Sequence, residues 1–221
     1  MKRFETGVYR AVAPLCAIFL LATSITLDAY IGKERLSRIR ERYGPFVATR
    51  FKYLDELVES LKSAEPRKKL EEVNDFWNGV RYGSDRKVWG KKDYWATPFE
   101  FLVKDRGDCE DYVIAKYFTL KEAGIPPEKL YFVYVRVRGK KTPHMVLAYY
   151  ETPDSEPLIL DSINYRVFPA SKRRDIVPVY TFNGELLERY ASHSRNGLKE
   201  KNRKVKRKWE ELMQRMKRND L

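Results

Sequence analysis

The stretch RGDCEDYVIAKYF, residues 106–118, predicts a core helix and places Cys109 at its start. Asp108 is a residue type that favours the N-cap position. Apolar side chains then recur at helical spacing and are expected to face the core: Val113, Ile114, Tyr117 and Phe118. We therefore expect a helix from about Asp108 to Lys121, ended by the Gly-Ile-Pro-Pro sequence at 124–127.

Three acids surround the thiol in this stretch, with Asp108 before it and Glu110 and Asp111 after it. A reactive cysteine works as a thiolate, and neighbouring carboxylates raise the pKa of a thiol because they disfavour a further negative charge. Helix capping explains the acids without any chemistry, since carboxylates stabilise the first turn of a helix. The pattern leaves open why the only cysteine outside the N-terminal segment lies among acids.

The rest of the chain predicts helices first and strands afterwards. Residues 33–63 and 67–80 carry apolar residues at helical spacing, whereas 81–98 contains glycine and proline and is predicted as loop. Beyond the cysteine helix the period changes to two, which predicts strands at 131–139, 144–150, 158–161 and 177–184. The first strand is expected to be half-buried through its valines, Val133, Val135 and Val137. Helices followed by an antiparallel meander indicate the α+β class.

Two polar residues on the predicted strands are able to complete a nucleophilic site with Cys109. His144, one of two histidines, opens the second strand, and Asp161 ends the third. A thiol at a helix start, a histidine that takes its proton and an aspartate that orients the ring are the parts of nucleophilic catalysis. Each residue alone is more often structural, and the sequence does not set the register between the strands.

The two ends of the 221-residue chain differ from its middle. Basic residues precede the apolar run at 11–26, so residues 1–30 are expected to be a signal peptide or an N-terminal membrane anchor. Residues 186–221 are expected to form a basic helical C-terminal tail, and 33–185 a single domain. Export would leave Cys109 as a free thiol, because the other cysteine lies within the apolar run.

Three longer segments resemble the bacterial transglutaminase-like cysteine peptidases, and among them the LapG-type periplasmic adhesin proteases. They are DYWATPFEFLVKDRGDCEDYVIAKYFTLKEAGIP, HMVLAYY and PLILDSIN, within a resemblance that spans about residues 73–164. The resemblance implies a papain-like α+β core in which the nucleophile lies at a helix N-terminus. It also implies a Cys-His-Asp triad, with Cys109 as nucleophile, His144 as base and Asp161 as the orienting residue.

The same resemblance implies a calcium ion beside the nucleophile, held by Asp108, Glu110 and Asp111. Elementary chemistry agrees, because Ca²⁺ prefers six to eight oxygen ligands and a bound dication would reverse the local field that opposes the thiolate. The implied substrate is the N-terminal region of a large surface adhesin, cut at a small-residue site in the periplasm. The implied partner is an inner-membrane cyclic-di-GMP receptor that sequesters the protease.

Other interpretations remain open on the residues alone. Amide transfer of the transglutaminase type uses the same acyl-enzyme chemistry with an amine in place of water. A membrane-anchored binding protein without catalysis would instead use the basic tail to dock on an acidic partner. The tail is expected to be mainly a solvated helix face, no nucleic-acid partner is expected, and membrane contact is restricted to the N-terminal segment. The basic tail has no counterpart in the family pattern.

Overall fold

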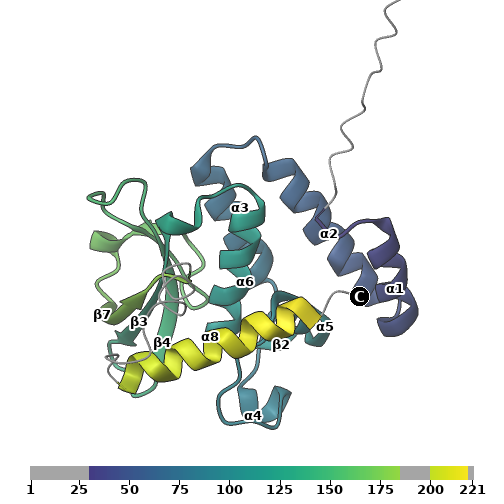
Figure 1. Cartoon of the computed structure of the whole chain (residues 1–221). Helices are drawn as coiled ribbons and strands as arrows, with labels where there is room; N and C mark the ends of the chain where they lie inside the picture. The colour runs from purple at the N-terminus through teal and green to yellow at the C-terminus, as the bar shows by residue number, and fades with distance from the viewer. Residues whose placement is uncertain (1–29, 185–199, 219–221) are drawn as a thin grey trace, which may run out of the picture.

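A computed structural model describes residues 30–184 and 200–218 (Figure 1). The expected signal or anchor lies outside these residues except for Tyr30, and so does the first part of the expected tail. Among the helices in the two described ranges, none is long and apolar enough to cross a membrane. The described residues therefore belong to the expected domain and to the last helix of the chain.

The described chain forms a helical layer packed against one antiparallel sheet (Figure 1). The helices are α1 (Lys33–Tyr43), α2 (Pro45–Leu61), α3 (Pro66–Asn78), α4 (Asp85–Val88), α5 (Pro98–Lys104), α6 (Cys109–Glu122) and α8 (Glu200–Arg218). The sheet contains β3 (Leu130–Val137), β4 (Pro143–Tyr149), β5 (Leu158–Leu160), β6 (Phe168–Pro169) and β7 (Ile176–Phe182). Two further strands, β1 (Arg81–Tyr82) and β2 (Arg106–Gly107), form a short parallel pair. The predicted α+β class is confirmed.

The strand order in the sheet is β6-β5-β4-β3-β7. Consecutive strands from β3 to β6 form the predicted meander, but β7 returns to pair with the free side of β3. The valine side of β3 packs in a small second cluster with Val146, Ala148 and Ile159, whereas Phe132 packs in the main core with the helices. The expected half-buried strand is confirmed from Val133 onward, because the valines are buried while Tyr134 is half-buried and Arg136 is exposed. The start of β3 is buried on its other face as well, where Leu130 and Phe132 pack against the helices.

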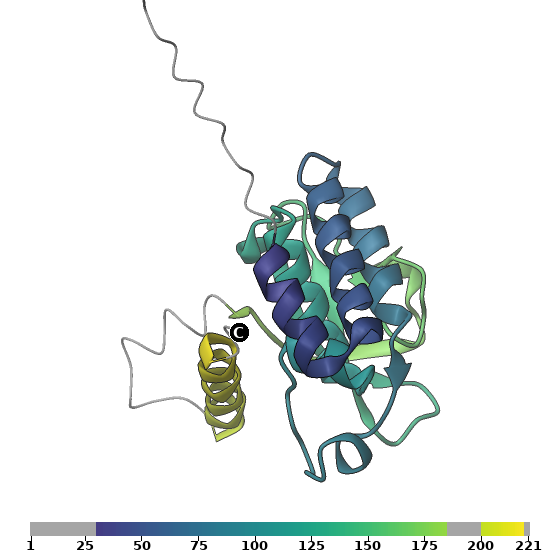
Figure 2. The same cartoon turned by 90° about the vertical axis from the view of Figure 1, so that its right-hand side faces the viewer.

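The helix predicted over 33–63 is two helices, α1 and α2, broken at Gly44. Gly44 has φ 88°, which L side chains rarely adopt, and Pro45 follows as the first residue of α2. The stretch predicted as loop also contains the short elements β1 and α4. Figure 2 shows α1 and α2 side by side on the part of the molecule that lies away from the sheet.

Helix α6 is the centre of the fold, because it packs against α3 on one side and β4 on the other. Every residue from position 111 to 120 is buried, including polar ones. Trp77 of α3 stacks on Phe101 of α5 at 5.4 Å between ring centroids and donates a 3.0 Å hydrogen bond to Thr119 of α6. Phe101 in turn meets Tyr112 in the first half of α6 at 4.9 Å between ring centroids, so α3 and α5 together fix the helix that begins at Cys109.

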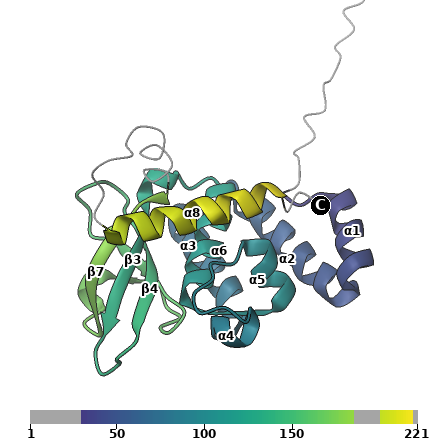
Figure 3. The same cartoon turned by 60° about the horizontal axis from the view of Figure 1, so that its bottom comes forward.

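The basic helix α8 is not solvated all round, since Trp209 enters the main core and is 2% exposed. Its indole stacks on Phe118 at 5.8 Å and meets Phe132 edge-on at 5.4 Å. Gly184 allows the approach, because a Cβ there would lie 2.7 Å from the Trp209 ring. Figure 3 shows α8 running along one side of the molecule, from the sheet toward α5. Through Trp209 the helix covers that side of the core.

We predict that Trp209→Ala destabilises the protein by about 3–5 kcal/mol, because it leaves a large cavity among aromatic rings. Urea unfolding followed by far-UV circular dichroism measures this loss. Arg207→Ala on the exposed side of the same helix, where the side chain is 72% exposed, is the matched control and should change stability by less than about 0.5 kcal/mol. Equal unfolding midpoints for Trp209→Ala and the wild type would show that α8 does not belong to the core.

Candidate active site

Cys109 is the first residue of α6. Just before it, the backbone at Gly107 lies very close to the side chains of Asp111 and Phe101. At Gly107 a Cβ atom would lie 2.4 Å from Asp111 Oδ2 and 2.7 Å from the Phe101 ring. Asp108 follows in an extended conformation at the N-cap. Glycine is therefore required at position 107 for the acid of the first helical turn to fold back over the helix start.

Asp111 performs the capping that the sequence allowed. Its side chain is fully buried, and its two oxygens accept the backbone N–H groups of Ala96 at 2.8 Å and Asp108 at 3.2 Å. Burial raises the pKa of Asp111 well above its ordinary value, although these two N–H groups work in the opposite direction. Asp108 occupies the expected N-cap position and forms a capping box with Asp111, so capping accounts for these two acids but not for Glu110.

Asp85 of α4 joins the acids beside the thiol, and sequence analysis did not find it. Oxygens of Asp85, Asp108 and Asp111 lie within 4.8 Å of one another. Asp85 is 6% exposed, and its Oδ2 accepts the Tyr94 N–H at 2.5 Å. It lies in a region without periodicity, distant in sequence from Cys109, so no local pattern points to it.

The cluster has the chemistry of a cation site. Asp85 Oδ1 and Asp108 Oδ1 are buried without a hydrogen-bond partner. Burial, together with the charges of Glu110, Asp111 and Asp85, raises the pKa of Asp108 to about 9, and burial also raises the pKa of Asp85. Buried carboxylates at such distances repel one another unless they are protonated or neutralised. Oxygen-only donors with unsatisfied lone pairs fit Ca²⁺, which accepts many carboxylate ligands in flexible geometry.

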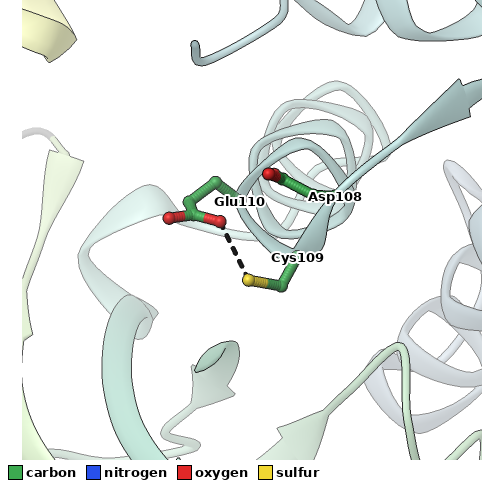
Figure 4. A group of neighbouring side chains, drawn as sticks. All are labelled: Asp108, Cys109 and Glu110. Carbon is green, nitrogen blue, oxygen red and sulfur yellow. Dashed lines mark hydrogen bonds between the residues drawn. The ribbon is translucent and has the colours of Figure 1, made fainter. Parts of the chain in front are cut away.

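Glu110 contacts the thiol directly. The Cys109 Sγ–H donates to Glu110 Oε2 at 2.8 Å, and Figure 4 shows that Glu110 is the acid whose carboxylate reaches the sulfur. Burial, the Glu110 charge with its hydrogen bond, and Asp108 raise the pKa of Cys109 well above its ordinary value; only the Met145 N–H opposes them. In this arrangement the acids keep the thiol protonated, as the sequence pattern indicated.

The strand register brings His144 and Asp161 together. Leu147 pairs with Leu160, so Asp161, one residue past β5, lies diagonally across from His144 at the start of β4. His144 Nε2 and Asp161 Oδ1 are 2.6 Å apart, and both side chains are buried. Burial raises the pKa of Asp161, but hydrogen bonds from His144, the Ile163 N–H and Arg173 outweigh it and lower this pKa to about 2.

Cys109 and His144 line the same cleft, whose volume is about 890 Å³. Because Nε2 of His144 contacts Asp161, Nδ1 is the ring nitrogen left to exchange a proton in the cleft. Three large apolar side chains of the cleft are exposed, Tyr82 (69%), Ile163 (46%) and Tyr165 (59%). A nucleophile, a base and exposed apolar surface in one cleft are suited to acyl transfer on a polypeptide.

We predict that calcium binding releases protons, because the metal-free fold keeps Asp108 protonated from about pH 4 to its pKa of about 9. Apparent calcium affinity should rise with pH across this range. Without calcium, the free energy of unfolding should fall as pH rises through this range. The reason is that Asp108 loses its proton at a lower pH in the unfolded chain than in the folded one. Isothermal titration calorimetry in buffers of different ionisation enthalpy counts the released protons.

Asp85→Asn tests the acid that the tertiary structure adds to this cluster. It should weaken calcium binding by more than about tenfold, because a ligand and its charge are lost. Asp154→Asn on an exposed turn is the control and should bind calcium like the wild type. Mg²⁺ should bind weakly to the wild type, since it demands near-octahedral geometry. Unchanged calcium affinity in Asp85→Asn would remove Asp85 from the site.

Comparisons with known proteins find a related family and similar solved structures. A comparison with curated protein sequences finds no match. Among solved structures, Legionella pneumophila LapG is 41% identical with a TM-score of 0.62, over 68% of this chain and 82% of that chain. Its calcium-bound form is 37% identical with a TM-score of 0.66, over 83% and 98%. Its EGTA-treated form is 37% identical with a TM-score of 0.67, over 83% and 96%.

The family comparison covers the cleft and both halves of the fold. Residues 55–174 match the model of the bacterial transglutaminase-like cysteine proteinases, a range that contains Cys109, His144 and Asp161 as well as the acid cluster. This range is more than half of the chain, and its nucleophile-bearing helix and antiparallel strands are the elements described above. The chain therefore belongs to the bacterial transglutaminase-like cysteine proteinase family.

Proposed function

We propose that this protein is a calcium-dependent cysteine endopeptidase that uses Cys109, His144 and Asp161 as its catalytic triad. The observation that carries the proposal is the pairing of His144 with the buried Asp161 at 2.6 Å, while His144 itself lines the same cleft as Cys109 at the start of α6. A binding protein without catalysis has no need of this combination. Membership of a cysteine proteinase family supports the same reaction class.

Each residue has a defined step in the reaction. His144 Nδ1 takes the proton of Cys109 Sγ, and the thiolate attacks the scissile carbonyl to form a tetrahedral intermediate. His144 then protonates the departing amine, and a thioester to Cys109 remains. Water, deprotonated by His144, hydrolyses the thioester and regenerates the thiol. Asp161 keeps its negative charge throughout and stabilises the protonated ring.

A bound calcium ion supplies positive charge beside these steps. Asp85, Asp108 and Asp111 would hold it, with Glu110 close to both the thiol and Asp108. If calcium neutralised these acids, their charge would no longer raise the pKa of Cys109. The hydrogen bond from the thiol to Glu110 would then be weaker. The similarity to LapG structures in calcium-bound and EGTA-treated forms supports calcium as the metal.

The proposed substrate is the N-terminal region of a large surface adhesin, cut at a small-residue site. Similarity to Legionella pneumophila LapG supports this choice, together with the family resemblance of the segments around Cys109. The same resemblance supports an inner-membrane cyclic-di-GMP receptor as the partner that sequesters the protease. Both assignments require a location in the periplasm, which the basic and apolar sequence of residues 1–30 supports.

We predict that Cys109→Ala abolishes cleavage of an adhesin N-terminal fragment, and that His144→Ala lowers it by more than about 10³-fold. Asp161→Asn should retain a small residual rate, because this residue orients the ring and does not react. His193→Ala, at the other histidine, is the control and should keep full activity. Electrophoresis and mass spectrometry of the fragment measure the rates.

The same assay separates hydrolysis from amide transfer. With a primary amine present, a protease releases products that end in a free carboxylate, whereas a transglutaminase attaches the amine to the intact fragment. Cleavage by the Cys109→Ala protein would contradict the triad, and amine attachment without cleavage would replace the proposed reaction.

We predict that residues 1–30 export a fused reporter that is active only outside the cytoplasm, because a basic segment followed by an apolar run directs secretion. Mass spectrometry of the native protein should then find either a cut near Ser24 or Ala29, or an intact N-terminus in the membrane fraction. A silent fusion, with the complete chain in the cytoplasm, would refute the proposed location.

A further inference from the structure

Arg173 binds the side of Asp161 that faces away from the histidine. Its Nη2 donates to Asp161 Oδ2 at 2.6 Å, while Oδ1 contacts His144 at 2.6 Å and accepts the Ile163 N–H at 2.9 Å. Arg173 is 3% exposed, although it follows a short 3₁₀ turn at the edge of the sheet. Both oxygens of Asp161 are thus occupied, and its carboxylate plane is fixed from two sides.

A second acid fixes the guanidinium itself. Arg173 Nε and Nη2 donate to the two oxygens of Asp175 at 2.9 and 2.8 Å, so one fork of the arginine binds Asp175 while Nη2 also reaches Asp161. The remaining nitrogen, Nη1, is buried without a hydrogen-bond partner. An unpaired buried donor costs free energy, so stability alone is a poor reason to bury this arginine.

Other groups hold the backbone of Asp161. Asn78 of α3 donates to the Asp161 carbonyl at 2.9 Å, and its own Oδ1 accepts from Lys116 of α6 at 2.8 Å. Lys116 is fully buried. The charged groups around Asp161 are therefore His144 from β4, Arg173 after the 3₁₀ turn and, at longer range, Lys116 from α6. Among the described residues, Arg173 and His144 are the charged side chains that bind the carboxylate directly, beside the Ile163 N–H.

We propose that Arg173 is a positioning residue for the catalytic triad. By holding Asp161 Oδ2, it presents Oδ1 to His144 Nε2, so that the neutral ring carries its proton on Nε2 and keeps the Nδ1 lone pair for the thiol. Without Arg173 the carboxylate is held from the Oδ1 side alone, and the ring tautomer is no longer fixed by a carboxylate bound on both sides. The inference rests on the proposed function, because it assigns a role to Arg173 through Asp161.

The first test reads the tautomer directly in the calcium-loaded full chain. Nitrogen-15 NMR of the histidine rings distinguishes Nε2–H from Nδ1–H, and the chain has two histidines, so His144→Gln assigns the signals. We expect the Nε2–H form in the wild type and in Arg173→Lys, which keeps a charged donor, and a mixture of both forms in Arg173→Met. Arg174→Met removes the same charge from the adjacent exposed residue and should match the wild type.

The second test is kinetic. Arg173→Met should lower kcat by about 10-fold to 100-fold with KM nearly unchanged, and Arg173→Lys should recover most of this loss. If Arg173→Met does not fold, Asp175→Asn, which releases the guanidinium from its other partner, carries both measurements and should give a smaller change of the same kind. An Nε2–H ring and wild-type kcat in the folded variant would overturn the inference. A wild-type protein that cleaves no adhesin fragment would instead refute the proposed function, and the ring tautomer would still decide the role of Arg173.

Discussion

The repulsion among buried carboxylates at the start of α6 is the constraint on which the rest of the site depends. Asp111 is satisfied by two backbone N–H groups, but Asp85 and Asp108 each keep a buried oxygen without a partner. Protonation of Asp108 relieves this repulsion and leaves the Cys109 thiol hydrogen-bonded to Glu110. A divalent cation relieves it in another way and removes the field that opposes the thiolate. Calcium would thus stabilise the helix start and activate the nucleophile through one electrostatic effect.

The second half of the site is electrostatically the opposite of the first. Asp161 is as deeply buried as Asp111, yet its pKa is lowered to about 2 because His144, a backbone N–H and Arg173 all donate to it. The two halves lie on different elements, α6 on one side and the strands β4 and β5 on the other. On one side of the cleft, the Cys109 thiol requires added positive charge to ionise. On the other side, the carboxylate of Asp161 already has a positive partner in Arg173.

The C-terminal helix connects the core to the acid cluster. Arg215 of α8 donates to the Trp95 carbonyl, and Lys208 and Lys204 form ion pairs with Asp93. The same short segment supplies the N–H groups of Tyr94 and Ala96 to two acids of the cluster. The basic charge that marked the tail in the sequence thus binds, in part, the segment that shapes the cation site, and Trp209 anchors the helix that carries it.

The sequence by itself determined the features that depend on near neighbours along the chain. Cys109 at a helix start, Asp108 at its N-cap and the positions of β4 and β5 follow from spacing and propensity, because these interactions act within one turn or one strand. His144 and Asp161 were also identifiable as residue types at strand ends, although their register was not.

Only the tertiary structure decided which distant residues meet. Asp85 begins the short helix α4 and Arg173 directly follows a 3₁₀ turn, so no periodicity marks either residue. They reach the site through the packing of α4 and the return of the chain after β6. The docking of Trp209 against Phe118 and Phe132 depends in the same way on surfaces supplied from elsewhere. Burial and charge pairing between distant residues leave no pattern in the local sequence. Their free energy arises only when folding brings the distant segments into contact.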